Sequence, residues 1–278
     1  MSALVNAHWL HEHLHRPELV VLDASISFQI PNTPAPVLDE VIPGALRFNY
    51  DDDFHDPSYG LPHMMPSESA FNHHAQALGL NKDSVIVVYD NTGTFASPRA
   101  WWMLKSMGHE QVYVLNGGLP AWIAQGYATQ PTHNKSKELG NFQGQRSQDG
   151  FIHADAVLEF ANAKSATILD ARSQARFDAQ VPEPREGIRS GHIPHSQCLP
   201  FSVLIDNGQL KDRDALASAF ASRLAAHNDN QPLVFSCGSG VTACILALAA
   251  YELGHRQLQV YDGSWTEWGS RPDLPIEC

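Results

Sequence analysis

The stretch PLVFSCGSGVTACILALAAY, from Pro232 to Tyr251, joins an apolar strand pattern to an apolar helix pattern through a turn that contains two glycines. Leu233 to Ser236 form a short run typical of a buried strand, and Val241 to Tyr251 form a run long enough for a buried helix. Cys237 opens the turn between them. A cysteine at this place faces the positive end of a helix, which stabilises a negatively charged sulfur.

The same rhythm of strand and helix recurs along the chain. SVIVVYD, from Ser84 to Asp90, is rich in β-branched residues, and SPRAWWMLKSMG, from Ser97 to Gly108, has a helical pattern. Strands that alternate with helices are typical of parallel sheets with helices on both faces. The sequence therefore predicts an α/β fold in which each domain is a doubly wound, mostly parallel sheet flanked by helices.

The chain also repeats itself. GHEQVYVLNGGLPAW, residues 108–122, matches GHRQLQVYDGSWTEW, residues 254–268, at six of fifteen positions without a gap. LVVLDAS near the N-terminus corresponds to ATILDAR in the second half, in the same order. The segment 128–150 is polar and rich in Gln, Gly and Lys, as linkers are. We therefore predict an N-terminal domain over 1–127, a linker over 128–150 and a C-terminal domain over 151–278.

Composition excludes several classes of protein. The 278 residues carry a formal charge of -12 and contain no dense cluster of Lys and Arg, which argues against a nucleic-acid partner. The four cysteines contain no C-x-x-C pair, so neither a disulfide framework nor a structural zinc site is expected. The first twenty residues lack a signal-peptide pattern, and the longest apolar run is too short to cross a bilayer. We expect a cytoplasmic protein with reduced thiols and no membrane contact.

The duplication allows the two copies to be compared at the turn. In the register of the repeat, Asp90 and Asn91 correspond to Ser236 and Cys237, so a thiol is present in the second copy alone. The polar pair predicts a turn that reaches solvent, and a cysteine in such a turn is expected to be functional. The remaining thiols are assigned to packing, apart from the C-terminal residue, which we expect to be mobile; they are Cys198, Cys244 and Cys278.

The turn CGSGVT is suited to holding an anion. Glycines at two positions allow successive backbone N–H groups to point inward at the start of the helix, which favours a thiolate or a persulfide on Cys237. Cysteine phosphatases need an arginine six positions after the nucleophile, where this chain has Ala243. The loop contains no basic residue at all. The sequence therefore argues against phosphoester chemistry, and the contexts of papain-like peptidases are also missing.

The tandem copies, CGSGVT in the second copy, SPRAWW in the first and YDGSWTEW near the end resemble the rhodanese superfamily. The resemblance runs from about Asn6 to Ile276 and is most specific to the 3-mercaptopyruvate sulfurtransferases, because thiosulfate sulfurtransferases usually carry basic residues after the cysteine. It implies two tandem rhodanese-like domains, of which the first has no catalytic cysteine. It also implies that the loop residues bind substrate; these are Gly238, Gly240, Val241 and Thr242.

The resemblance assigns the substrate's carboxylate and carbonyl to two arginines of the second domain, Arg176 and Arg185. An arginine fork orients a carboxylate through two hydrogen bonds. The alternative from the residues alone is that these arginines pair on the surface with Glu183 or Glu186. Arg189 lies close by in the sequence and is a weaker candidate.

Proton handling is implied for a serine of the loop, Ser239, and for an acid–histidine pair of the first domain, which falls on Asp51 and His63. The match around the acid needs an insertion of one residue, so Asp52 or Asp53 could replace Asp51. A histidine oriented by a carboxylate relays protons, and a serine could bridge it to the reacting sulfur.

These expectations combine into a double-displacement enzyme with no metal or organic cofactor. Cys237 would take sulfur from 3-mercaptopyruvate in a cleft between the domains, release pyruvate and pass the sulfur to a thiol, to cyanide or to a thioredoxin-like protein. Two alternatives remain: a thiosulfate:cyanide sulfurtransferase, and a noncatalytic sulfur carrier or interaction module. Donor preference separates the first from our assignment, and turnover of small molecules separates the second.

Overall fold

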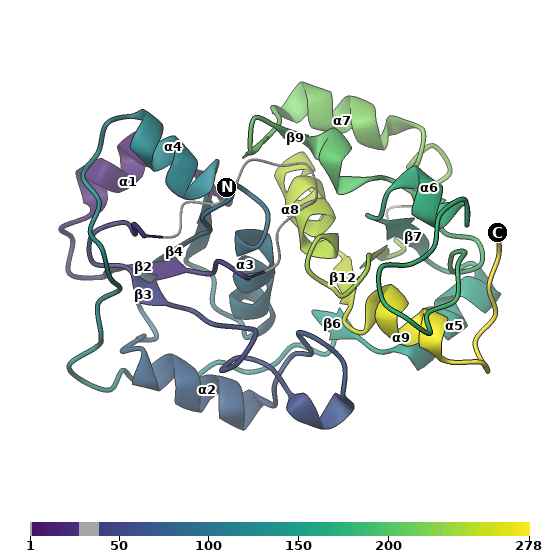
Figure 1. Cartoon of the computed structure of the whole chain (residues 1–278), viewed down its shortest axis with the longest axis horizontal. Helices are drawn as coiled ribbons and strands as arrows, with labels where there is room; N and C mark the ends of the chain where they lie inside the picture. Colours follow the sequence, from purple (N-terminus) through teal and green to yellow (C-terminus); the bar gives the residue numbers. More distant parts are fainter. Residues whose placement is uncertain (1, 28–38, 229) are drawn as a thin grey trace. The chain divides into compact units, whose positions relative to one another are not determined.

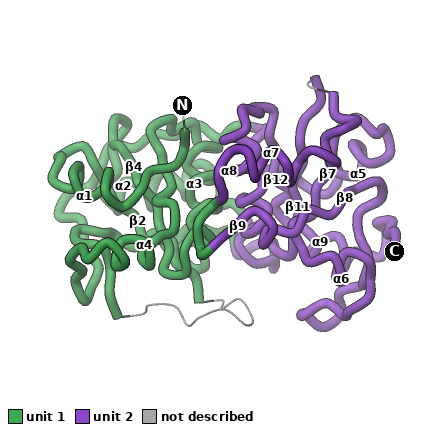
Figure 2. The backbone as a smooth tube through the Cα atoms, turned by 90° about the horizontal axis from the view of Figure 1, so that it is seen from above, with its two compact units in different colours: residues 1–56, 65–147, 207–210 green, residues 57–64, 148–206, 211–278 purple. Residues whose placement is uncertain are grey.

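A computed structural model describes residues 2–27, 39–228 and 230–278. The chain divides into two compact units (Figure 2). Unit 1 comprises residues 1–56, 65–147 and 207–210, and unit 2 comprises residues 57–64, 148–206 and 211–278. In the described part of the chain, no helix combines the length and the apolar character needed to span a bilayer.

Unit 1 is built on a five-stranded sheet in the order β1-β5-β4-β2-β3 (Figure 1). All neighbouring strands are parallel, and the register places Asp23 beside Tyr89. β-branched and aliphatic residues fill the central strands, as expected where both faces are covered. The strands are β1 (Leu4–Val5), β2 (Leu19–Asp23), β3 (Leu46–Arg47), β4 (Val85–Tyr89) and β5 (Val112–Leu115).

Helices cover both faces of this sheet. α1 (Ala7–His13) and α4 (Gly118–Ala124) pack on one face, where Leu10 and Trp122 join Val87 in the core. α3 (Ser97–Ser106) packs on β4 and β5. It covers the other face, towards which the alternation of side chains directs Ile86. α2 (Glu68–Ala77) and the short 3-10 helix η1 (Pro57–Tyr59) complete the elements before β4.

Unit 2 repeats the topology strand for strand. Its sheet has the order β6-β12-β11-β7-β8, again with parallel neighbours throughout, so each strand has a counterpart at the same place in unit 1. The predicted duplication and the doubly wound α/β fold are confirmed. The strands are β6 (Phe151–Ile152), β7 (Thr167–Asp170), β8 (Gln197–Cys198), β11 (Leu233–Ser236) and β12 (Leu258–Tyr261).

Two faces are again covered. α5 (Ala154–Ala163) and α9 (Ser264–Ser270) bury Val157 and Trp268 against Val234 on one face. α8 (Ala243–Leu253) packs on β11 and β12. Its residues from Ala243 to Ala250 are all buried, which agrees with the predicted core helix. The other elements of unit 2 are α6 (Gln174–Phe177), η2 (Phe201–Leu204), β9 (Ile205–Asp206) and α7 (Arg213–Ala221), whereas β10 (Gln209–Leu210) is assigned to unit 1.

Residues 128–147 of the segment predicted to be a linker are assigned to unit 1 and make hydrogen bonds with the rest of that unit. The backbone N–H of Asn134 donates to Ala45 O at 2.8 Å, and His133 Nε2 lies 2.8 Å from Asp23 Oδ2. Burial raises the pKa of Asp23, but the hydrogen bonds from His133 and Ser25 outweigh burial and hold this pKa below its ordinary value. The polar side chains and the backbone of this segment are therefore hydrogen-bonded to the surface of the domain.

Candidate functional site

Cys237 directly follows β11, at the edge of the sheet where the carboxyl ends of the parallel strands meet. Its Sγ accepts a hydrogen bond from the backbone N–H of Gly240 at 3.1 Å. Gly240 has φ of 77°, a conformation that glycine adopts without steric cost, so the turn folds back towards the sulfur. One loop N–H, that of Gly240, therefore contacts the cysteine sulfur, and the wider ring of N–H groups stays a prediction.

The expectation that this turn reaches solvent is wrong for the cysteine itself, because Cys237 is 1% exposed. The turn is enclosed by the start of α9. Backbone N–H groups of Trp265 and Thr266 donate to the carbonyls of Cys237 and Gly238, both at 2.9 Å. The Thr266 hydroxyl donates to the same Gly238 carbonyl at 2.6 Å. These bonds occupy the carbonyls of Cys237 and Gly238 with donors from α9, while the Gly240 N–H contacts the sulfur.

Ser264, which sequence reasoning missed, is a neighbour of the sulfur. Its Oγ accepts the backbone N–H of Cys237 at 3.2 Å and lies 4.0 Å from Sγ, and it donates to Tyr261 O at 2.8 Å. The residue has φ of 49°, a backbone conformation that is costly for any residue with a side chain. The repeat carried a signal for it, because the matching residue is Gly118 with φ of 53°.

Arg176 lies on α6 and faces the turn. A methyl group built on Gly238 would lie 3.4 Å from Arg176 Nη2. The guanidinium also pairs with Glu183, with 2.5 Å between Nη2 and Oε2. The predicted alternative, pairing with Glu183, is thus realised at the same time as proximity to the loop. Gly238 does not have a positive φ, and a methyl group there would make an ordinary contact with Arg176.

Arg185 is exposed, and its Nη1 donates to the Thr266 hydroxyl at 3.2 Å. Since Thr266 also holds the Gly238 carbonyl, Arg185 is tied to the outer side of the same turn. Arg189 has a different role. Its guanidinium donates to backbone carbonyls of Trp268, Gly269, Arg271 and Leu274, which anchors the C-terminal segment. These contacts give Arg189 a structural role, and its weaker candidacy for substrate binding stays a prediction.

The remaining predicted residues occupy varied positions. Ser239 is half-buried at the tip of the turn, Val241 is buried, and Thr242 caps α8. His63 belongs to unit 2 and has φ of 62°, whereas Asp51 belongs to unit 1. The structure thus gathers the loop and both arginines on one unit, while the predicted acid–histidine pair is divided between the two units.

Asn49 organises the run of three aspartates in unit 1. Its Oδ1 accepts the backbone N–H of Asp51 at 3.2 Å, and its Nδ2 donates to Asp52 Oδ2 at 2.7 Å. Its carbonyl accepts the backbone N–H of Asp53 at 2.9 Å. The three carboxylates therefore sit on one asparagine-stabilised turn, and Asp52 is the one engaged by the amide.

The turn of unit 1 corrects the register of the repeat by one residue. The N–H of Ala24 donates to Tyr89 O at 2.8 Å, as the N–H of Ala171 donates to Ser236 O at 2.8 Å. Tyr89 therefore corresponds to Ser236, and the counterpart of Cys237 is Asp90. The loop of unit 1 is longer than that of unit 2, which shifted the alignment of the sequences.

The positions of the other three thiols agree with their predicted roles in packing or at the C-terminus. Cys198 on β8 and Cys244 on α8 are buried, and Cys278 is exposed. Burial raises the pKa of Cys198 to about 12, so its thiol stays protonated and unreactive. Within the described ranges, no three His, Cys, Asp or Glu side chains are grouped as metal ligands would be.

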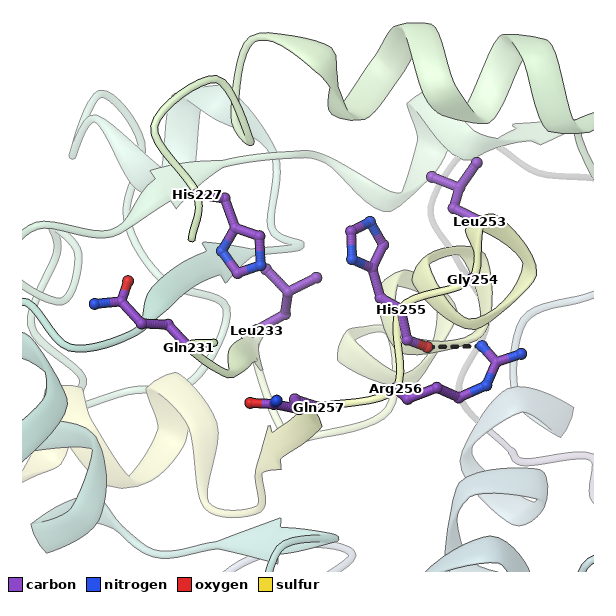
Figure 3. Close-up of a pocket in the computed structure, with 8 residues that line it drawn as sticks. All are labelled: His227, Gln231, Leu233, Leu253, Gly254, His255, Arg256 and Gln257. Atoms are coloured by element: carbon purple, nitrogen blue, oxygen red, sulfur yellow. Dashed lines mark hydrogen bonds between the residues drawn. The ribbon is translucent and has the colours of Figure 1, made fainter. Parts of the chain in front are cut away.

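A cavity of about 360 Å³ lies elsewhere on unit 2 (Figure 3). It is lined by His227, His255 and Arg256 together with Leu233, the first residue of β11. Cys237 follows the last residue of the same strand. The cavity and the turn that contains Cys237 therefore lie at opposite ends of β11, roughly 13 Å apart along the strand. This cavity is not part of the cysteine site.

Known proteins resemble this chain in both sequence and fold. The rhodanese-like domain family matches residues 6–125 and again 153–271. The chain belongs to the rhodanese family. A relative of this rhodanese chain from Escherichia coli, named 3-mercaptopyruvate sulfurtransferase, is 38% identical and aligns with 98% of this chain and 97% of its own. A mitochondrial Arabidopsis thaliana protein named thiosulfate/3-mercaptopyruvate sulfurtransferase 1 is 40% identical, over 99% of this chain and 78% of its own.

The tandem rhodanese architecture is also found in solved structures. The crystal structure of SseA, a 3-mercaptopyruvate sulfotransferase from Escherichia coli, superposes with a TM-score of 0.83. It is 34% identical and covers 95% of this chain and 99% of the other. The two-domain α/β architecture predicted from the repeat is therefore that of a known tandem rhodanese.

Proposed function

We propose that this rhodanese is a sulfurtransferase that moves the sulfur of 3-mercaptopyruvate through a persulfide on Cys237 to a thiol or to cyanide. The observation that carries the proposal is the hydrogen bond from Gly240 N–H to Cys237 Sγ in a loop without any basic residue, with the guanidinium of Arg176 beside Gly238. The relatives named for this reaction support the same assignment.

In the first half-reaction the Cys237 thiolate attacks the sulfur of 3-mercaptopyruvate. A sulfur–sulfur bond forms, and the carbon–sulfur bond breaks with both electrons moving to carbon, which leaves the enolate of pyruvate. The proton of the donor's thiol group passes to the enolate carbon, which gives pyruvate and leaves the persulfide as an anion. The Gly240 N–H that now contacts Sγ is placed to stabilise the negative charge of the resulting persulfide.

In the second half-reaction an acceptor thiolate, or cyanide, attacks the outer sulfur of the persulfide. The new bond forms to that sulfur while the electrons of the sulfur–sulfur bond return to Cys237 as thiolate. The products are an acceptor persulfide or thiocyanate, and the enzyme regains its starting state. The two steps make a ping-pong cycle that needs no cofactor.

Arg176 and Arg185 are assigned to the carboxylate and carbonyl of the donor. Arg176 faces Gly238, and Arg185 is tied to the turn through Thr266, so both guanidinium groups lie on the unit that carries the nucleophile. Planar guanidinium groups bind a carboxylate with defined orientation. Ser239, His63 and Asp51 are assigned to proton transfer on the family resemblance.

A thiosulfate sulfurtransferase is the second candidate, because the Arabidopsis relative is named for both donors. Thiosulfate carries two negative charges, and the loop from Gly238 to Thr242 supplies no side-chain cation for the second one. We predict that the acceptor is a thiol, cyanide or a thioredoxin-like protein. We also predict that the protein is located in the cytoplasm.

The test measures pyruvate release from 3-mercaptopyruvate with dithiothreitol as acceptor, beside thiocyanate formation from thiosulfate and cyanide. Wild type should release pyruvate rapidly and use thiosulfate poorly, and Cys237→Ser should abolish turnover, whereas Cys244→Ser should retain it. If thiosulfate proved the better donor, the second candidate would replace the first. A folded wild type that turned over neither donor would favour a noncatalytic sulfur carrier.

A further inference from the structure

A buried series of alternating charges runs from the end of β7 to the reactive turn. Arg172 Nη2 lies 2.6 Å from Asp170 Oδ2, and Arg172 Nη1 lies 2.9 Å from Glu183 Oε1. Glu183 Oε2 in turn lies 2.5 Å from Arg176 Nη2. The side chains of Asp170 and Arg172 are 1% exposed, that of Glu183 is 4% exposed and that of Arg176 is 24% exposed, so water has little access to the contacts of Arg172 and reaches the series at Arg176.

Arg172 gives this series a fixed starting point. Its Nη2 also donates to Gly191 O at 2.8 Å, and its guanidinium carbon lies 4.1 Å from the centre of the Trp265 ring. Burial alone lowers the pKa of Arg172, but Asp170 and Glu183 outweigh burial and raise it, so the group stays charged. A charged arginine held on several sides fixes the carboxylate that it binds.

Glu183 consequently fixes the orientation of Arg176. The Glu183 carboxylate accepts hydrogen bonds from Arg176 Nε, at 3.2 Å, and from Arg176 Nη2, at 2.5 Å. Together they form a two-point contact along one edge of the guanidinium plane. A methyl group on Gly238 would lie 3.4 Å from Nη2 and 4.0 Å from Nη1. The face of Arg176 that meets the reactive turn is therefore decided by Glu183.

Glu183 also sets the charge beside the turn. Its carboxylate offsets the positive charge of Arg176, while Asp170 offsets that of Arg172, so the four-residue series is neutral as a whole. Beside the turn this neutral series leaves the charge of Arg185, and that single charge attracts a dianion less than Arg185 together with an uncompensated Arg176 would, since the Coulomb attraction grows with the charges on both partners. The Arg176 guanidinium can still orient a donor that has a single carboxylate.

We propose that Glu183 is a positioning residue that selects the sulfur donor. By holding Arg176 in one orientation and offsetting its charge, Glu183 favours the monoanionic donor 3-mercaptopyruvate over the dianionic donor thiosulfate. This inference rests on the proposed function and concerns the same site. Glu183 acts through Arg176 and does not touch the reacting sulfur.

The test compares Glu183→Gln with wild type for both donors. The amide keeps the shape of the carboxylate but removes its charge. We expect KM for 3-mercaptopyruvate to rise about fivefold with kcat within about twofold, because the amide has one acceptor oxygen for the two Arg176 N–H groups and no longer fixes the guanidinium, while the nucleophile is kept. The ratio of kcat/KM for thiosulfate to that for 3-mercaptopyruvate should rise about tenfold. Glu183→Asp, which keeps the charge at shorter reach, should raise KM but retain the wild-type ratio.

Glu186→Gln is the matched control, because it removes an exposed carboxylate three residues along the same segment and should leave both quantities unchanged. A donor ratio in Glu183→Gln within twofold of that in Glu186→Gln would overturn the proposal. If Glu183→Gln did not fold, an unchanged KM in Glu183→Asp would overturn it. Wild type that turned over neither donor would instead overturn the proposed function, so the two failures are distinguishable.

Discussion

Asp90 of unit 1 stands at the position that Cys237 holds in unit 2. Each residue directly follows the central strand of its sheet, and each carbonyl accepts a backbone N–H from the first turn of the last helix of its domain. The donors are Leu119 for Asp90 and Trp265 for Cys237, both at 2.9 Å. Duplication has kept the turn's anchoring while the side chain at its start has become a carboxylate in one copy and a thiol in the other.

The Asp90 carboxylate fills the anion-binding turn of its own unit. Its Oδ2 accepts the backbone N–H groups of Phe95, Ala96 and Ser97 at 3.0, 2.9 and 2.8 Å, and the Ser97 hydroxyl at 2.7 Å. These donors lie at the N-terminus of α3, where a helix favours negative charge. The same property of the fold serves structure in unit 1 and is proposed to serve sulfur chemistry in unit 2.

Removing this carboxylate should destabilise unit 1. Asp90→Ala leaves several buried N–H groups without their acceptor, so we expect a loss of about 3 kcal/mol in the free energy of unfolding. Asp90→Asn, which keeps one acceptor oxygen, should lose less. Urea denaturation followed by circular dichroism measures both. Asp83→Ala, at an exposed aspartate on the same unit, is the control, and equal stability of the two alanine variants would contradict this reading.

The two glycines that follow Cys237 should respond differently to alanine. Gly240→Ala forces a side chain into φ of 77°, which costs roughly 1 kcal/mol and displaces the N–H that contacts Sγ. We expect kcat/KM for pyruvate release to fall at least about tenfold. In Gly238→Ala the new methyl group would make an ordinary contact at 3.4 Å with Arg176. We therefore expect kcat/KM for pyruvate release to fall by less than about threefold in this variant. Thermal melting controls for folding, and equal losses of activity would count against the role assigned to Gly240.

Alkylation should separate the thiols by their surroundings. At pH 8 a pKa of about 12 leaves roughly one Cys198 side chain in ten thousand as thiolate, and the residue is buried, so iodoacetamide should not modify it in the folded protein. Cys278 is exposed and should react first. Mass spectrometry of peptides labelled before and after denaturation measures this order. Modification of Cys198 in the native protein as fast as that of Cys278 would show that its pocket opens readily.

Repetition and periodicity allowed much of the fold to be predicted from the sequence. The runs at 84–90 and 233–236 became β4 and β11, and the apolar run beginning at Val241 became α8, because long buried elements leave an unambiguous apolar pattern. The linker over 128–150 stays a prediction. Side chains such as His133 make specific hydrogen bonds with other residues of unit 1, and composition does not distinguish a solvated segment from one that is hydrogen-bonded to a surface.

The sequence by itself determined the family and the glycine-containing turn that begins at Cys237, the proposed nucleophile, because these reside in consecutive residues whose spacing is visible along the chain. The tertiary structure decided which distant groups meet that turn. Ser264 and Glu183 come from other segments and reach the site only when β7, β11 and α9 pack together. Contacts of this kind depend on side-chain direction and close packing across strands, and no local pattern in the sequence records them.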